Sequence, residues 1–252
     1  MDMIRDNLKI EALKEPRGFI RVLLFVLAIL AFATTTSLTT RTSAHVKCLN
    51  NAKRDIDFTV KISYPFDLTT NSWKLNPCAG NDTLAGPYGN FSAASQFYVF
   101  VGVMAFLISL ASIGIYTFAS DRYDDDRKLP LIDLIVTVIW CLLWLIASSA
   151  WADKFTQLRH YSDPSTIAGN EKHLICPKSS CSVEQIETGQ FAKLYVSLIF
   201  GFLNVFVWGF NCWFLYKETS FFRGSEPPPV PTEQAAQPPA DPYPQQFPQG
   251  SM

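Results

Sequence analysis

The chain has 252 residues, of which 48% are hydrophobic, and it carries a formal net charge of -1 at neutral pH. Proteins that bind duplex nucleic acid normally present a basic surface, so this near-neutral balance argues against a nucleic-acid partner. The hydrophobic residues are gathered in four long runs, which argues against an ordinary soluble domain.

Each of the four runs is long enough to cross a membrane as a helix. A helix of about 20 residues spans a hydrocarbon core of about 30 Å. The chain is therefore predicted to be an all-α membrane protein, a bundle of four transmembrane helices. The predicted spans are residues 19–38, 97–119, 131–152 and 194–216. The other segments are an N-terminal segment 1–18, a loop 39–96, a turn 120–130, a loop 153–193 and a tail 221–252.

The first run leaves one alternative open. Val22–Ala33 is short, and its end, Ala31-Phe32-Ala33, is similar to a signal-peptidase site. The segment before it is long and of mixed charge, unlike the basic start of a signal peptide, so a membrane span is the favoured interpretation. The orientation of the other three spans is the same whether the first run is cleaved as a signal peptide or stays as a membrane span.

The two longer loops carry chemistry typical of the lumenal or outer side of a membrane. The first loop holds two N-glycosylation acceptors, at Asn81 and Asn90, and Asn81 is favoured because Asn90 lies close to the next span. Four of the six cysteines lie in these loops: Cys48 and Cys78 in the first, Cys176 and Cys181 in the second. Glycans and disulfides both form on the oxidising side. We therefore expect lumenal loops and cytosolic termini.

The first loop is predicted to hold a small β unit. Ile56, Phe58, Val60 and Ile62 alternate with polar residues, as in a half-buried strand. Four cysteines allow three disulfide connectivities, and the favoured one joins neighbours within each loop, Cys48 to Cys78 and Cys176 to Cys181. In the second loop, Asp163-Pro164 and Cys176-Pro177 are expected to prevent a long helix.

The fourth span contains two amides, and heptad spacing places them on one stripe. The stripe is Leu194, Ser197, Gly201, Asn204, Trp208, Asn211 and Leu215. Small and polar residues in one stripe are typical of a helix–helix interface in lipid. We call Ser197, Gly201, Asn204, Trp208 and Asn211 the seam, and predict that it packs against a sister helix, another subunit or a partner's membrane anchor.

Polar groups at mid-membrane can also mark a transport pathway, which would require ionisable partners. The spans offer only Arg21 and Asp133, both near span ends where side chains reach the interface. Packing is therefore the favoured role of the seam. On that basis, replacing Asn204 and Asn211 together by leucine is expected to lower the yield of cross-linked oligomer or partner complex.

Other positions support a packed, non-enzymatic bundle. The third span shows one aromatic and small-residue face, and the second shows a small-residue stripe. These positions are Trp140, Trp144, Ala147 and Trp151, then Ala105, Ser109 and Ser112. Cys141 is predicted to be a packing residue, and Cys212 is a candidate for palmitoylation. The chain lacks the common motifs of metalloproteases, phosphate-binding loops and serine hydrolases, so no catalytic, metal or cofactor site is predicted.

The tail is rich in Pro and Gln and is predicted to be a disordered cytosolic segment. Residues 228–231 form a minimal P-x-x-P, a possible ligand for an SH3 domain, although a solvated spacer is the favoured interpretation.

Several sequence blocks, in order from residue 14 to about residue 220, match one known family. They are Lys14-Glu15-Pro16-Arg17-Gly18-Phe19, Ala31-Phe32-Ala33-Thr34, Tyr64-Pro65-Phe66, Ser148-Ser149-Ala150-Trp151-Ala152, Phe200-Gly201-Phe202-Leu203-Asn204, Asn211-Cys212-Trp213-Phe214 and Lys217-Glu218-Thr219. In these blocks the chain resembles the synaptophysin family (synaptophysin, synaptoporin, pantophysin, mitsugumin), whose four-span unit is the MARVEL domain.

This resemblance implies a non-enzymatic protein of small secretory vesicles with a disulfide in each lumenal loop. It also implies homo-oligomers, cholesterol-rich membrane, and association with the vesicle SNARE synaptobrevin in its sorting and recycling. The tail departs from synaptophysin because it is short and has Tyr243 as its only tyrosine, which puts tail-driven endocytic roles in doubt. A channel-like oligomer and a junctional or adhesive protein are the alternatives.

Overall fold

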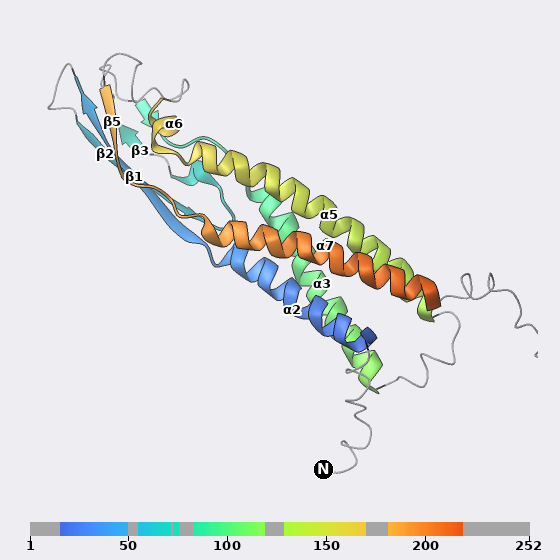
Figure 1. Ribbon diagram of the computed structural model, residues 1–252. Helices are drawn as coiled ribbons and strands as arrows, with labels where there is room; N and C mark the ends of the chain where they lie inside the picture. Colours follow the sequence, from blue (N-terminus) through green and yellow to red (C-terminus); the bar gives the residue numbers. More distant parts are fainter. Residues whose placement is uncertain are drawn as a thin grey trace, which may run out of the picture.

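The computed structural model describes residues 16–49, 55–71, 73–75, 83–118, 129–169 and 181–218. Within them, four long helices form a bundle, and a small β-sheet lies at one end of it (Figure 1). The helices are α2 (Pro16–Thr36), α3 (Ser92–Phe118), α5 (Leu129–Tyr161) and α7 (Ala192–Glu218). We call the end of the bundle next to the sheet the sheet end, and the opposite end the distal end.

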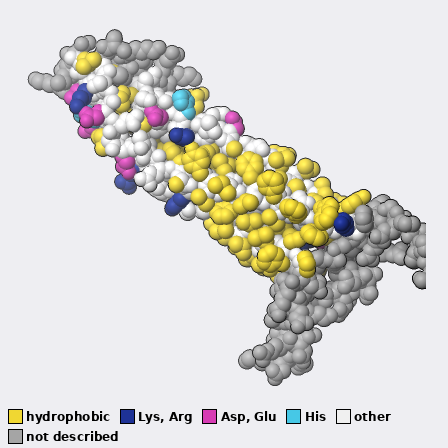
Figure 2. Space-filling model, viewed as in Figure 1, with side chains coloured by type: hydrophobic (Ala, Val, Ile, Leu, Met, Phe, Trp, Pro, Cys, Tyr) yellow, Lys and Arg dark blue, Asp and Glu magenta, His cyan; other side chains and the backbone are white. Residues whose placement is uncertain are grey.

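All four helices are long and apolar enough to cross a membrane. Figure 2 shows a continuous hydrophobic band over the helices, whereas charged side chains gather toward the sheet end. The outward side chains of the band are large and apolar, for example Phe100, Ile135, Leu142 and Phe206. Each helix includes most or all of one predicted span, because an uninterrupted apolar run favours a helix in lipid.

The packing partners define the order of the helices around the bundle. α2 packs against α3 and α7, and α5 packs against the same two helices. α2 and α5 therefore lie diagonally across the bundle, as do α3 and α7. A side chain that joins α2 to α5 must cross the bundle interior.

Helix α5 continues well beyond the predicted end of its span at residue 152. It ends at Tyr161, and in the added turns Phe155 and Leu158 are buried. The extension forms because these apolar residues find a core next to the sheet instead of lipid. Asp163 then caps the short helix α6 (Pro164–Ala168), with Pro164 in its first turn, so Asp163-Pro164 breaks the helical path as predicted.

The sheet draws strands from both loops. Its order is β2-β1-β5, all antiparallel, with β1 (Thr39–Cys48) in the centre, β2 (Ile56–Ser63) from the first loop and β5 (Cys181–Glu187) from the second. The predicted strand over residues 56–62 is confirmed, whereas β1 and β5 were not predicted. The first loop also forms a two-stranded ribbon, β3 (Trp73–Leu75) with β4 (Thr83–Ala85), and a short 3-10 helix, η3 (Leu68–Thr70).

One face of the sheet is buried and the other carries charge. Alternate residues of β1 and β2 point into the core, including Ala44, Val46, Phe58 and Val60. On the outer face Lys47 Nζ lies 2.6 Å from Glu184 Oε2. This hydrogen bond and the charge attraction raise the pKa of Lys47 and lower the pKa of Glu184. The pair links β1 to β5 on the exposed side.

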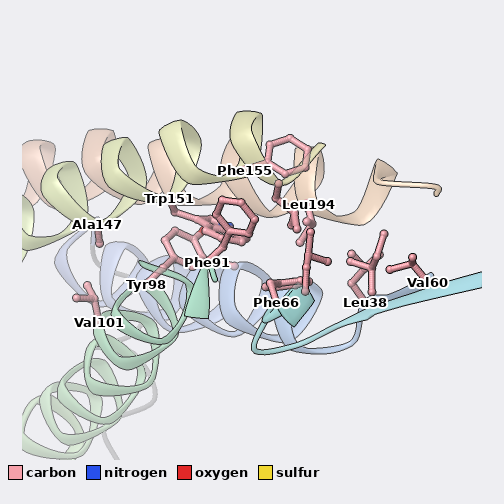
Figure 3. Close-up of a cluster of buried hydrophobic side chains, with 14 of the residues drawn as sticks. Leu38, Val60, Phe66, Phe91, Tyr98, Val101, Ala147, Trp151, Phe155 and Leu194 are labelled. Atoms are coloured by element: carbon pink, nitrogen blue, oxygen red, sulfur yellow. The ribbon is translucent and has the colours of Figure 1, made fainter. Parts of the chain in front are cut away.

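A single hydrophobic core runs from the bundle into the sheet. Figure 3 shows it passing from Val101 and Ala147 between the helices to Leu38 and Val60 beside the sheet. The sheet is therefore packed on the bundle and is not a separate domain.

Candidate functional site: the buried seam and the sheet-end junction

The predicted seam of α7 lies inside the bundle. Ser197, Asn204 and Trp208 are fully buried, and Asn211 is 4% exposed. The same stripe continues with buried Leu194 and Leu215. The heptad spacing therefore identified one face of α7 correctly, but helices of the same chain cover that face.

Ser197 is the polar contact point of three helices near the sheet end. Its hydroxyl lies 2.5 Å from the hydroxyl of Thr35 on α2 and donates to the carbonyl of Ala31 over 3.2 Å. The carbonyl of Ser197 accepts a 2.7 Å hydrogen bond from the hydroxyl of Tyr98 on α3. Hydrogen bonds between helices are useful in lipid because no water competes for these groups.

At Gly201, helix α7 lies very close to α3 and α5. A Cβ atom placed there would lie 2.6 Å from the hydroxyl oxygen of Tyr98 and 2.7 Å from Oγ of Ser148 on α5. Both distances are shorter than a van der Waals contact. A larger residue would force Tyr98 or Ser148 to move, so glycine favours the close approach of α3, α5 and α7 at this depth.

The two seam amides make different contacts. Asn211 Nδ2 donates to the hydroxyl of Thr137 on α5 over 3.4 Å, and both residues are buried. Asn204 Nδ2 donates to the carbonyl of Phe200 within α7 over 2.8 Å. Asn211 therefore joins two helices, whereas the donor group of Asn204 bonds to its own helix.

Several buried polar atoms in the bundle accept or donate no hydrogen bond among the described residues. They include Oδ1 of Asn204, Oγ of Ser109 and Ser148, and Nε1 of Trp140, Trp144, Trp151 and Trp208. Two of them lie beside the seam contacts described above, since Ser148 lies against Gly201 and the ring of Trp144 is 5.7 Å from that of Tyr98. Buried polar groups of this kind are usually satisfied by internal water.

At the distal end, Arg21 of α2 forms an ion pair with Asp133 of α5. Arg21 is 1% exposed, so the pair crosses the interior between diagonal helices. Both residues lie near the ends of their helices, but the ion pair between them was not predicted. A charge in hydrocarbon is costly unless it is paired, and pairing across the bundle avoids that cost.

With this pair, polar side chains from all four helices line the axis of the bundle. The polar column runs from Arg21 and Asp133, through Asn211 with Thr137 and then Asn204, to Ser148, Tyr98, Ser197 and Thr35. Sequence reasoning identified the part on α7 and noted Arg21 and Asp133, but not that these two residues pair. Thr35, Tyr98 and Thr137 were missed because they have no pattern on their own helices.

The first loop docks into the sheet end through the turn Tyr64-Pro65-Phe66. Phe66 is fully buried and stacks on Trp151 of α5, with ring centroids 5.2 Å apart. The carbonyl of Pro65 accepts a 2.9 Å hydrogen bond from the hydroxyl of Ser95 on α3. Phe66 has a φ of 67°, which is unusual for a bulky residue and requires support from its surroundings. Figure 3 shows Phe66, Phe91 and Trp151 close together at this junction.

The predicted disulfide residues are only partly described. Cys48 and Cys181 are both disulfide-bonded, and they lie opposite each other in the register of β1 and β5. Cys78 and Cys176 lie outside the described residues, so pairing within each loop stays a prediction.

The other two cysteines are free thiols on facing helices. Cys141 Sγ lies 3.6 Å from the carbonyl oxygen of Val205 on α7, and its thiol also hydrogen-bonds with that of Cys212. Cys141 thus packs between helices. Cys212 is half-buried, and its palmitoylation stays a prediction.

The two glycosylation acceptors differ in what the structure describes. Asn81 lies outside the described residues. Asn90 forms a turn just before α3, since its Oδ1 accepts from the backbone N–H of Ser92 over 2.9 Å, while its Nδ2 donates to Asp67 over 2.9 Å. These contacts of Asn90 were not predicted, and its use as an acceptor stays a prediction. The tail with its P-x-x-P also lies outside the described residues.

Comparison with protein-family models places the chain in a known family. The model of the MARVEL membrane-associating domain matches residues 12–214, which covers α2, α3 and α5, most of α7, and both loops that build the sheet. Together with the four apolar helices, this match makes the protein an integral membrane protein. The chain belongs to the MARVEL family of membrane-associating domains.

Proposed function

We propose that the chain belongs to the synaptophysin branch of this family and organises the membrane of synaptic or other small secretory vesicles. In this role it is a non-enzymatic protein that supports the sorting of synaptobrevin, exocytosis and vesicle recycling. Cholesterol-rich membrane and homo-oligomers belong to the same proposal, and all of these features rest on the resemblance.

The observation that carries this proposal is that the sequence blocks resembling the synaptophysin family contact one another in the fold. Phe66, from the first-loop block, stacks on Trp151 of the third-span block. Ser148 of that third-span block lies against Gly201 of the fourth-span block. Segments far apart in sequence thus pack as one unit, which supports their origin in a common bundle and argues against separate chance similarities.

The proposed topology places the sheet in the vesicle lumen and both termini in the cytosol. The disulfide-bonded state of Cys48 and Cys181 supports an oxidising compartment on the sheet side. A disulfide-stapled lumenal unit, with one bond in each loop, and a glycan on Asn81 complete this topology. Peptide mapping of the non-reduced protein tests the pairing, and glycosidase treatment of microsomes tests the side.

The buried seam changes how a SNARE anchor or a second copy must bind. Because α7 turns its amides into its own bundle, partners must use the outward apolar faces. We expect a photocrosslinking residue at exposed Leu142 to capture synaptobrevin or a second copy, and one at buried Ala147 to capture neither. Replacing both Asn204 and Asn211 by leucine should now leave cross-linking unchanged, provided that the bundle stays folded.

Cell fractionation tests the proposed role directly. A tagged chain should move with small vesicles, and co-expression of synaptobrevin should increase its share there. Residence at plasma-membrane junctions, with or without synaptobrevin, would contradict a vesicle role and favour the adhesive alternative.

The polar column bears on the channel-like alternative. Trp144, Trp151 and Trp208 are fully buried in the same interior, so aromatic rings fill the space through which ions would pass. A single bundle therefore offers no support for conduction. A pathway would have to form between several copies.

A further inference from the structure

A polar basin lies at the sheet end of α5. It has a volume of about 410 Å³ and is lined by Thr156, Arg159, His160, Asp163, Ser165 and Thr166. Arg159 and His160 belong to the last turn of α5, and Asp163 caps α6. The basin therefore combines two basic groups and three hydroxyls with one carboxylate.

The charges of the basin suit a phosphate group. Arg159 and His160 are exposed. Guanidinium groups form strong, directional hydrogen bonds with phosphate oxygens. The carboxylate of Asp163 is partly engaged, because one oxygen accepts from the backbone N–H of Ser165 over 2.9 Å and from the Ser165 hydroxyl. Only one Asp163 oxygen is engaged in this way, so an incoming anion is expected to bind on the side of Arg159 and His160, away from this carboxylate.

An apolar furrow follows the outward face of α7. It has a volume of about 390 Å³ and is lined by Tyr195, Leu198, Ile199, Phe202, Leu203 and Phe206. These residues recur at helical spacing, and at about 1.5 Å rise per residue the furrow runs about 16 Å along the helix. It starts at the sheet end and points toward the middle of the bilayer, which is the direction of an acyl chain.

The basin and the furrow meet at one pair of side chains. Arg159 Nη1 donates a 2.8 Å hydrogen bond to the hydroxyl of Tyr195, and the ring of Tyr195 also packs on Phe155, with centroids 4.9 Å apart. Tyr195 belongs to the first turn of α7, where tyrosine commonly marks the border between hydrocarbon and head groups. Figure 2 shows basic and histidine side chains along this border of the hydrophobic band.

We propose that the basin and the furrow form one binding site for a phospholipid in the leaflet on the sheet side. Arg159 and His160 hold the lipid phosphate, and one acyl chain lies along the furrow from Tyr195 to Phe206. Tyr195 is a positioning residue, because it orients Arg159 at the border. The site requires only the membrane-spanning bundle and does not depend on the proposed vesicle role.

Retention of lipid by the purified full chain, measured by native mass spectrometry from detergent, tests the site. Phosphatidylcholine should be retained, whereas diacylglycerol with the same chains should be retained at least fivefold less. Neither glycerophosphocholine nor inorganic phosphate should displace the lipid at equal concentration. These results would show that binding requires both the phosphate group and the acyl chains of the lipid.

Substitutions locate the site. Arg159→Gln should lower phosphatidylcholine retention at least fivefold, and Arg159→Lys should keep most of it because the charge stays. Lys154→Gln is the matched control, since Lys154 is on the same helix but does not line the basin. Phe202→Ala should lower retention about threefold, while Phe210→Ala, on the same side of α7 but outside the furrow, should have little effect.

Three results would overturn the proposal. Equal retention of diacylglycerol would mean that the furrow alone binds apolar chains. Displacement by inorganic phosphate would assign the basin to soluble anions. Equal loss in Arg159→Gln and Lys154→Gln would mean that any basic residue at this border attracts lipid. The melting temperature of each variant, measured in the same detergent, shows whether a loss reflects unfolding.

Discussion

At the scale of single residues, the interior is defined by contacts that a larger side chain would break. Gly201 lets Tyr98 and Ser148 approach α7, and Ser197 joins three helices through its hydroxyl and its carbonyl. The heptad stripe predicted that these residues share one face, because small and polar residues in a span are seldom turned toward lipid. It could not predict their partners, which lie on helices far away in the sequence.

Gly201→Ala should destabilise the bundle by about 1–3 kcal/mol, because the new methyl group overlaps two buried oxygens. Chemical unfolding in mixed detergent micelles measures the change. Gly209→Ala on the same helix is the control, since its Cβ would meet only Cys141 Sγ, at 3.9 Å. The control should be neutral or slightly stabilising, because alanine favours a helix over glycine. Equal losses in the two variants would contradict the packing described at Gly201.

At the scale of elements, hydropathy predicted the four helices but not their exact lengths. Phe155 and Leu158 continue α5 because both are buried, and Phe155 packs against Phe191 and Tyr195 from a distant part of the chain, a contact that hydropathy alone does not predict. Strand β1 was missed because its sequence is rich in threonine and charge, although Thr42, Ala44 and Val46 alternate as buried residues. The strand becomes apparent only once β2 and β5 lie on its two sides.

The ion pair between Arg21 and Asp133 should be the main polar tie between α2 and α5. Removing one partner, in Arg21→Met or Asp133→Leu, should cost up to about 3–5 kcal/mol because the remaining charge loses this ion pair in a largely apolar setting. The double variant should recover most of this loss, since two apolar side chains fit the hydrocarbon. A double-mutant cycle in micelles measures the coupling, and additive losses would show that the two charges act independently.

At the scale of the whole molecule, the sheet and the bundle form one folding unit. The core is continuous, and the turn that carries Phe66 fills the sheet end between α3 and α5. The sequence predicted a β unit in the first loop, but not its contact with the spans or its third strand from the second loop. These features depend on contacts between distant segments, and the alternation of one strand does not encode them.

Phe66→Ala should weaken the whole molecule by about 3–5 kcal/mol, because it leaves a cavity beside Trp151. Hydrogen exchange should speed up in β2 and in the first turns of α3 together, since both contact this turn. Leu49→Ala is a control in the same loop, because Leu49 is 69% exposed, and should change stability by less than about 0.5 kcal/mol. Faster exchange in β2 alone would show that the sheet unfolds independently of the bundle.

The strand order β2-β1-β5 also sets a sequence of events during biosynthesis. β1 directly follows the first span and can pair with β2 early, but its other edge stays open until β5 has been translated. β5 lies between the third and fourth spans, so the sheet can close only after three of the four spans have been made. Until then the nascent chain presents an unpaired strand edge, a surface on which chaperones act and other chains can aggregate. The second loop therefore completes the sheet shortly before the fourth span completes the bundle.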